Sequence, residues 1–432
     1  MQLFSPKGFE RRFGRLPGQA EARAIGVFGV IAGIIMCGLS LYYGFRGETF
    51  MGRPLGTDFV EFYTAGKVLN EHDPVRIYDL PFLVQLEYKI LPSMPHDQMA
   101  MYGNAPYVAL LFRPLARLPY VWAYCVWLIF SMAVYLLGLW LLFRDLLPAG
   151  ARGAAFLLAV SSPMYILETW IGGQVSILGF LAMVVFVLCM RGGRGFLAGL
   201  ALGCAIYKPS LVAIPAAMLV FGAYWRALAG FVSGTALMGL LSVATVGVQG
   251  CLRWLDMLKV FRYLAITEPN LLRTNKYVDL NSFFSMLLGG GSVPRIVATV
   301  IGGAAFLYLA WVWWRSRNAP NDARLGLWAA TISWAMIINV YVPVYDTIVL
   351  VPAIALVANL VVERSETDRW FFRFWLVLLY LIPWLTQSAA EFLRLQLFTI
   401  LLAGFGYWVL TLRQHVGGSN GIVTEHLDRA VG

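Results

Sequence analysis

Six polar residues stand near the ends of long apolar stretches, where a charged or amide side chain is unusual. They are Asp58, Asn104, Glu168, Gln174, Lys208 and Asp346. A carboxylate can take a proton as a general base, an ammonium group can bind a phosphate, and an amide both donates and accepts hydrogen bonds. Because ionisable groups at membrane depth are costly and usually mark a site, this set predicts a polar substrate site at one end of an apolar protein.

Asp58 follows the first apolar stretch and precedes a helical pattern that begins at Phe59. One interpretation is structural, since an aspartate at a helix N-cap accepts hydrogen bonds from free backbone N–H groups. The other is catalytic, as a base at the membrane surface. The two roles can coexist, because a cap would hold the carboxylate in a defined direction.

The remaining polar residues allow similar pairs of interpretations. Lys208 with Pro209 interrupts an apolar hairpin, and its ammonium group is predicted either to bind a ligand phosphate or to extend to lipid headgroups. Asp346 starts an apolar stretch, so it is either a helix N-cap or a site residue. Gln174 follows two glycines in a tight turn, and Glu168 lies shortly before it.

The composition identifies the class of protein that must hold these residues. The 432-residue chain is 59% hydrophobic and 13% charged, with a mean hydropathy of +0.70. Soluble domains carry about 25% charged residues, so we predict an integral membrane protein. The net charge of +10 then reflects membrane orientation and anionic lipid, and we predict no nucleic-acid partner. The five cysteines form no disulfide framework, and no metal site is predicted.

Apolar stretches long enough to cross about 30 Å of hydrocarbon recur along the whole chain. The expected fold is an all-α polytopic bundle of about twelve transmembrane helices. We place them at residues 24–45, 119–143, 154–170, 175–190, 195–207, 209–224, 227–248, 293–314, 325–340, 347–362, 371–385 and 392–412.

Short basic segments at 144–152, 191–194, 226, 315–324 and 364–373 alternate with the apolar stretches. Such segments mark the cytoplasmic side, which predicts a cytoplasmic N-terminal segment at 1–23, a membrane domain at 24–412 and a flexible cytoplasmic tail at 413–432.

Two long outer loops then cover residues 46–104 and 250–292. Loops of this length are commonly functional, although their charges could simply be solvated. Residues 59–69 in the first loop predict an amphipathic helix lying along the membrane interface.

Several short motifs follow one another in an order that resembles glycosyltransferase family 87. They are Asp58-Phe59 with Tyr63, Ile77-Tyr78-Asp79, Asn104-Ala105-Pro106-Tyr107, Arg113-Pro114-Leu115, Leu118-Pro119-Tyr120, Gly173-Gln174, Lys208-Pro209 and Tyr345-Asp346. The resemblance covers about residues 56–258 and 345–350. Each motif is weak alone, and the ordered set carries the resemblance.

This resemblance implies a GT-C fold and an inverting transfer of a hexose, expected to be mannose, from a polyprenyl-phosphate donor to a lipid-linked or glycan acceptor. Asp58 would be the general base on the first outer loop. The donor phosphate is assigned to Lys208, Arg113 and Arg262. Substrate contacts are assigned to Tyr63, Asn104, Gln174, Asp346 and Glu168. No cofactor or metal is expected.

The implied setting is the bacterial inner membrane, with a monomer whose site faces the periplasm or cell exterior and whose termini are cytoplasmic. Its partners would be the donor, the acceptor and membrane lipids. The alternatives are a transporter or lipid flippase, and a non-catalytic lipid-binding subunit. Transporters usually contain two related halves with broken helices near the midplane, and this sequence has no such repeat.

Overall fold

The structure is a computed structural model that describes residues 6, 10, 15–94, 101–267 and 274–428, without the side chains of 262, 264–267, 274 and 413–428. Helices account for 81% of it, and the described residues form no strand beyond two isolated bridges. The prediction of an all-α protein is therefore confirmed. The assigned Arg262 lies on a helix, but its side chain is outside the described part.

Six helical segments are long and apolar enough to cross a membrane. They are α2 (Gln19–Phe45), α6 (Tyr120–Leu146), Trp225–Phe261 of α11 (Trp225–Thr267), α13 (Ser292–Arg315), η6 (Val344–Val349) with α15 (Leu350–Val361), and α16 (Glu366–Leu393). A seventh crossing is possible if α7 (Ala149–Val160) and the π-helix η4 (Met164–Ile171), bent by 50°, form one span. The chain is thus a polytopic helical protein.

The predicted number of about twelve spans is not confirmed, because several predicted spans are short helices. These short helices are α8 (Ser176–Arg191), α9 (Gly195–Cys204) and α10 (Pro209–Phe221). Two further helices, α14 (Asn321–Ile338) and α17 (Leu397–Asp428), complete the bundle. At 1.5 Å per residue, the ten residues of α9 extend about 15 Å, half of the hydrocarbon thickness. The structure therefore supports six or seven crossings by length and composition.

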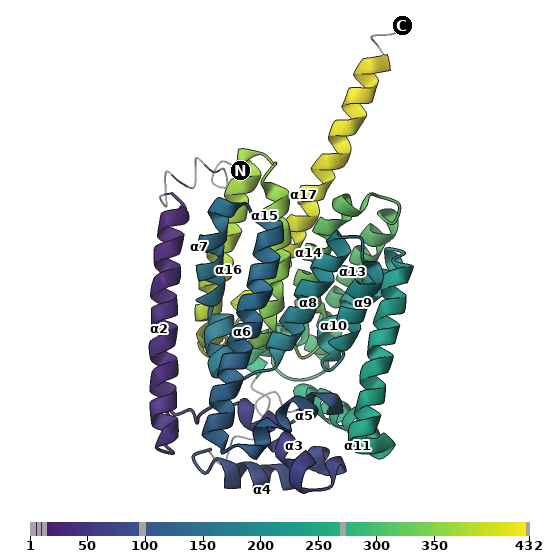
Figure 1. Cartoon of the computed structure of the whole chain (residues 1–432). Helices are drawn as coiled ribbons and strands as arrows, with labels where there is room; N and C mark the ends of the chain where they lie inside the picture. The colour runs from purple at the N-terminus through teal and green to yellow at the C-terminus, as the bar shows by residue number, and fades with distance from the viewer. Residues whose placement is uncertain (1–5, 7–9, 11–14, 95–100, 268–273, 429–432) are drawn as a thin grey trace.

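The bundle carries a separate layer of short helices across one end (Figure 1). This layer contains α3 (Phe59–Glu71), α4 (Leu80–Ile90) and α5 (Pro106–Phe112), with the 3₁₀-helices η2 (Pro74–Tyr78) and η3 (Leu115–Arg117) between them. The start of α2 and the end of α17 lie at the opposite end of the bundle. This arrangement agrees with a chain whose termini share one side of the membrane.

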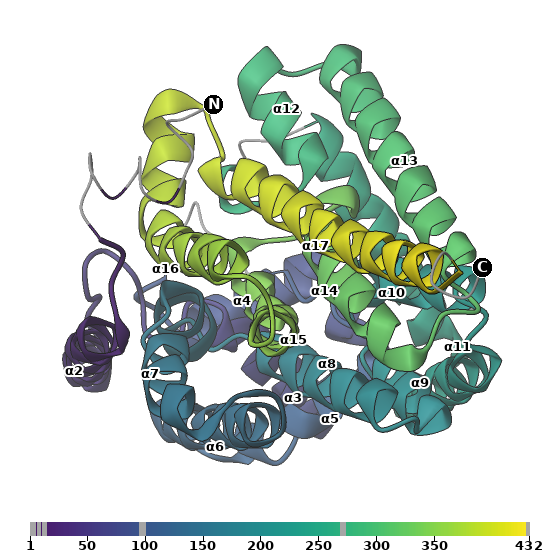
Figure 2. The same cartoon turned by 90° about the horizontal axis from the view of Figure 1, so that it is seen from above.

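The second predicted outer loop is largely helical. In α11 the helix continues past a break at Gly247 (φ +69°) to Thr267, and η5 (Thr274–Lys276) and α12 (Leu280–Leu288) follow. Viewed from above, α12 lies beside α13 at one edge of the bundle, whereas α2 stands at the periphery (Figure 2).

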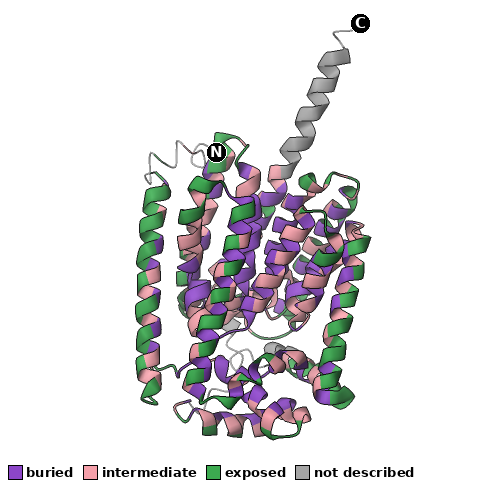
Figure 3. Cartoon of the chain, in the orientation of Figure 1, coloured by how far each residue is buried: buried purple, intermediate pink, exposed green. Residues whose placement is uncertain are grey.

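The outward sides of the long helices are exposed (Figure 3), and many of their exposed side chains are apolar. Examples are Phe28 at 75% exposure, Leu240 at 69% and Leu307 at 68%, on α2, α11 and α13. Exposed apolar side chains on long helices are stable only against lipid, so these surfaces indicate the part of the molecule inside the membrane.

Residues 59–69 form a helix as predicted, but they do not form an exposed interfacial face. Nine of the thirteen residues of α3 are buried, and the helix packs against α5 so closely that a Cβ on Gly66 would lie 2.5 Å from the Phe112 carbonyl oxygen. The aromatic ring of Phe59 contacts Tyr120 and Tyr124 of α6. The helices α4, α5, η2 and η3 all pack against α3, which makes it the centre of the end layer.

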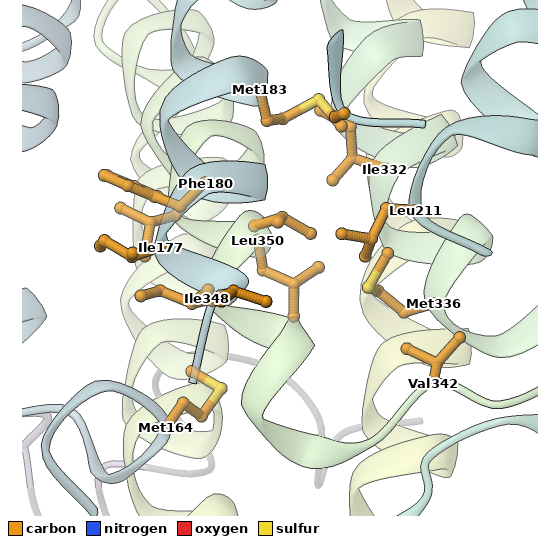
Figure 4. Close-up of a cluster of buried hydrophobic side chains, with 14 of the residues drawn as sticks. Met164, Ile177, Phe180, Met183, Leu211, Ile332, Met336, Val342, Ile348 and Leu350 are labelled. Atoms are coloured by element: carbon orange, nitrogen blue, oxygen red, sulfur yellow. The ribbon is translucent and has the colours of Figure 1, made fainter. Parts of the chain in front are cut away.

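A buried apolar cluster lies beneath this layer, between α8, α10, α14 and η6–α15 (Figure 4). Ile177, Leu211, Met336 and Ile348 are each no more than 1% exposed. The cluster fixes η6 against its neighbours, and η6 carries Asp346.

Candidate active site

Asp58 occupies the N-cap position of α3, but its side chain makes no capping hydrogen bond. Instead, Gln174 Nε2 donates a hydrogen bond of 2.8 Å to Asp58 Oδ2. The Asp58 backbone N–H donates to the Gly172 carbonyl at 3.1 Å. The carboxylate is therefore directed towards another part of the chain rather than its own helix, and the N-cap interpretation is wrong for this side chain.

The turn at residues 172–174 holds Gln174 in position. Gly173 has φ +81°, and a Cβ there would lie 2.6 Å from the Cβ of Phe59. Trp127 Nε1 donates to the Gly173 carbonyl at 3.1 Å, and the Gln174 backbone N–H donates to Thr169 at 2.9 Å. A left-handed backbone in close contact with α3 explains why this turn uses glycine.

Lys208 and Asp346 form an ion pair at the junction of α9 and α10. Lys208 Nζ lies 2.5 Å from Asp346 Oδ2 and 4.6 Å from the centre of the Tyr345 ring. Ser176 Oγ donates to Asp346 Oδ1 at 2.6 Å. The Asp346 side chain is fully buried, whereas that of Lys208 is 21% exposed, so a ligand could reach the ammonium group while Asp346 fixes it.

This geometry disagrees with the N-cap interpretation of Asp346 and with the snorkelling interpretation of Lys208. The N-cap of η6 is Pro343, and Asp346 lies inside that helix, so its N-cap interpretation is wrong. Lys208 is held by a buried carboxylate and does not extend freely towards headgroups, so snorkelling does not describe it.

Tyr277 and Tyr345 lie near both Asp58 and the ion pair. Each tyrosine interacts electrostatically with both Asp58 and Asp346. Tyr277 follows η5, whose Lys276 also acts on Asp58. Elements that are distant in sequence therefore meet around one polar site, and neither Lys276 nor Tyr277 was identified from the sequence.

Burial raises the pKa of Asp58, and the charge of Lys276 and the Gln174 hydrogen bond partly oppose that increase. Glu168 raises it further through its negative charge, while its own carboxylate accepts a hydrogen bond from Gln387 Nε2 at 3.0 Å. A carboxylate with a raised pKa is a stronger base than an ordinary aspartate, which suits proton abstraction near neutral pH.

Glu61 is a second carboxylate that the sequence analysis did not assign to the site. It follows Asp58 by three residues, a spacing that places both on one face of a helix. Burial and then the charges of Asp58 and Glu87 raise the pKa of Glu61 well above its usual range. Among the described residues, its carboxylate forms no hydrogen bond or ion pair. The i, i+3 spacing after Asp58 was the available signal.

The groups of this site are not fully covered. Asp58, Glu61, Lys208 and Tyr345 are all partly exposed, although their neighbouring residues in the chain are mostly buried. The arrangement offers a base, a fixed cation and a second carboxylate to a bound polar group.

Two assigned residues, Tyr63 and Arg113, lie elsewhere. Tyr63 projects about 140° around α3 from position 58, and its hydroxyl donates to the Leu118 carbonyl at 2.8 Å. Arg113 Nε donates to Asn70 Oδ1 at 3.3 Å and lines a separate surface pocket with Tyr63. Asn104 accepts a hydrogen bond from the Tyr78 hydroxyl through its backbone carbonyl. Gln174 binds Asp58, Glu168 lies near it, and Lys208 and Asp346 pair in the same region, whereas Tyr63 and Arg113 line the separate pocket.

Comparison with known proteins gives one match. The profile of glycosyltransferase family 87 matches residues 102–343, more than half of the chain. No curated protein and no solved structure matches. The matched region contains Glu168, Gln174 and Lys208, whereas Asp346 lies just after it and Asp58 lies well before it. On this match, the chain belongs to glycosyltransferase family 87.

Proposed function

We propose that this protein transfers a hexose, with mannose the expected sugar, from a polyprenyl phosphate to a hydroxyl group of a lipid-linked or glycan acceptor. Family membership supports glycosyl transfer. The observation that carries the proposed chemistry is the Asp58 carboxylate, which Gln174 holds at 2.8 Å in a site shared with the Lys208–Asp346 ion pair. A base and a fixed cation in one site suit the displacement of a phosphate.

In the proposed step, Asp58 takes the proton of the acceptor hydroxyl while that oxygen bonds to the anomeric carbon. The bond from the anomeric carbon to the phosphate oxygen breaks, and its electron pair leaves with the lipid phosphate. A single displacement inverts the anomeric centre. A positioned general base contributes about 10²–10⁴-fold to such a step.

Charge develops on the departing phosphate, and Lys208 is the residue we assign to it. Asp346 and Ser176 hold the ammonium group in place before the ligand arrives. Fixed cations of this kind stabilise developing charge without rearranging during the reaction. Lys276, which acts on Asp58, supplies a second positive charge in the same region.

The proposed orientation in the membrane rests on the position of the end layer, which carries Asp58. This layer lies at the opposite end of the bundle from the start of α2 and the end of α17 (Figure 1). With cytoplasmic termini in a bacterial inner membrane, the site would face the periplasm or cell exterior, with the donor's lipid tail among the spans. We predict that the protein is a monomer and that it needs neither a metal nor a cofactor. Activity should therefore be retained in excess EDTA, and its loss would contradict metal independence.

Asp58→Asn tests the function directly. With purified protein and a labelled polyprenyl-phosphate mannose, we expect turnover to fall at least 100-fold while donor affinity stays within about twofold. Asp256→Asn, at an exposed carboxylate paired with Lys259, is the matched control and should retain parental activity. Near-normal turnover of Asp58→Asn would remove Asp58 from the base role.

Lys208→Ala separates donor binding from the chemical step. We expect weaker donor binding in the folded variant, measured on detergent-purified protein. Unchanged affinity would contradict the phosphate assignment. Uptake of labelled lipid into vesicles without release of free lipid phosphate would instead favour a transporter.

A further inference from the structure

A polar pocket lies on the other side of α3 from the candidate active site. Its volume is about 460 Å³, and the C-terminal half of α3 and the chain between α5 and α6 form its walls. Neither Asp58 nor Lys208 lines it. A volume of this size is within the range of small-ligand sites.

The charge of this pocket is positive. Lys67, Arg113 and Arg117 line it together with one carboxylate, Glu71. Lys67 Nζ pairs with Glu71 Oε1 at 2.6 Å, so that carboxylate is already neutralised. Within the described part of the chain, neither arginine has a carboxylate partner. Two guanidinium groups are therefore available to an anionic ligand.

Asn70 fixes the position of one of these arginines. Its Nδ2 donates to the Arg113 backbone carbonyl at 2.8 Å, and its Oδ1 accepts from Arg113 Nε at 3.3 Å. These bonds leave the terminal guanidinium nitrogens of Arg113 free. A planar guanidinium held in this way can bind two phosphate oxygens at once.

The pocket lies beside the end of a membrane-crossing helix. Leu118 and Pro119 line it and lead directly into α6. Leu118 is 40% exposed and Trp122, in the first turn of α6, is 59% exposed. The Trp122 ring contacts the ring of Phe45, the last residue of α2, and the two ring centres are 5.4 Å apart. Exposed aromatic residues at the ends of spans are typical of the level of the lipid headgroups.

We propose that this pocket binds the phosphate of an anionic phospholipid headgroup in the leaflet on the α3–α5 side. Arg113 and Arg117 would contact the phosphate, and the acyl chains would lie along the exposed apolar surface that begins at Leu118. This reassigns Arg113 from the sugar donor to a structural lipid. The proposal is independent of the reaction at Asp58.

The test measures lipid binding to the purified full chain by native mass spectrometry, with phosphatidylglycerol and phosphatidylcholine as probes. We expect a preference for phosphatidylglycerol that falls about fivefold for each arginine removed in Arg113→Gln and Arg117→Gln. Arg253→Gln, at an exposed arginine on α11, should leave the preference unchanged.

Glu71→Gln tests the same site in the opposite direction. Removing this carboxylate frees the charge of Lys67, so binding of phosphatidylglycerol should strengthen. This result is expected even if an arginine variant fails to fold, and unchanged or weaker binding in folded Glu71→Gln would overturn the proposal.

Inorganic phosphate distinguishes the source of the phosphate group. We expect it to compete poorly with phosphatidylglycerol, because it lacks the acyl chains. Competition by phosphate at equal concentration, lost in Arg113→Gln, would overturn the lipid assignment. A phosphatidylglycerol preference that persists when both arginines are replaced would also overturn it.

Discussion

At the residue scale, opposing influences act on the pKa of one carboxylate of the site, that of Asp58. Burial raises the pKa of Asp58, while Lys276 and the hydrogen bond from Gln174 restrain that rise. The restraint matters because a base must be ionised at the working pH to accept a proton. Gln174 therefore both orients Asp58 and adjusts its basicity.

Gln174→Leu should move the acidic limb of the pH–activity profile to higher pH. Gln174 stabilises the ionised form of Asp58, so its removal raises the pKa, and activity is lost on the acidic side. The limb should move to higher pH, and kcat/KM should also fall above the limb, because Gln174 orients Asp58 as well. The profile of kcat/KM measures both effects. Gln85→Leu, exposed on α4, should leave the limb in place, and an unmoved limb in Gln174→Leu would contradict the proposed coupling.

Glu61 is predicted to act in its protonated form. Since burial and the charges of Asp58 and Glu87 raise its pKa well above the usual range, Glu61→Gln should keep initial rates within about fivefold of the parent. Glu61→Leu, which cannot form a hydrogen bond to the substrate, should lose at least tenfold. Equal losses in both variants would show that the ionised carboxylate is required.

At the element scale, irregular helices assemble the site. The π-helix η4 ends at the turn that carries Gln174, and the 3₁₀-helix η6 carries Asp346. Thr169 Oγ1 donates to the Tyr345 carbonyl at 3.3 Å, which joins the two elements. π-helical turns are rare and frequent at functional sites, so their occurrence here agrees with the location of the chemistry.

Gly173→Ala should reduce activity more than stability, and Gly193→Ala is its matched control. Both glycines have a left-handed backbone, with φ +81° and φ +70°, so either substitution should cost about 1–2 kcal/mol of stability. Only at Gly173 would the new Cβ press against Phe59 and displace Asp58 from Gln174. Thermal stability and turnover are measured on both variants. Equal turnover in the two would show that the turn does not position the base.

At the scale of the whole molecule, the short helices remain in the bundle because they pack closely. Glycines on α9 and α11 recur at four-residue intervals: Gly199 and Gly203 face α11, and Gly230 and Gly234 face α9. A Cβ on Gly199 would collide with the backbone carbonyl of Ala227. Small residues at this spacing allow helix backbones to approach in membranes, where close packing replaces the hydrophobic effect.

Gly199→Leu should destabilise the bundle strongly. The side chain must displace backbone rather than a flexible neighbour, so we expect a loss of at least ~3 kcal/mol or failure to purify as a single species. Gly239→Leu, on α11 with open space around the glycine, should be tolerated. Thermal denaturation in detergent and size-exclusion profiles distinguish the two. Comparable stability of both variants would contradict the close-packing interpretation.

Part of this organisation was predictable from local patterns. The helix beginning at Phe59 was predicted, as were the glycine turn before Gln174 and the break at Lys208-Pro209, because each depends on neighbouring residues. The number of spans was not predictable in the same way. Apolar composition does not distinguish a ten-residue helix packed in the bundle from one that crosses the membrane.

The sequence by itself determined that the chain is helical, that its long apolar segments require a membrane, and that Asp58, Gln174, Lys208 and Asp346 are out of place in such a chain. Periodicity and composition are local properties, so they are sufficient for these conclusions. Only the tertiary structure decided that Gln174 binds Asp58 and that Asp346 binds Lys208. It also separated Tyr63 and Arg113 from them. Those pairings join residues more than 100 positions apart, and packing alone determines which distant side chains meet.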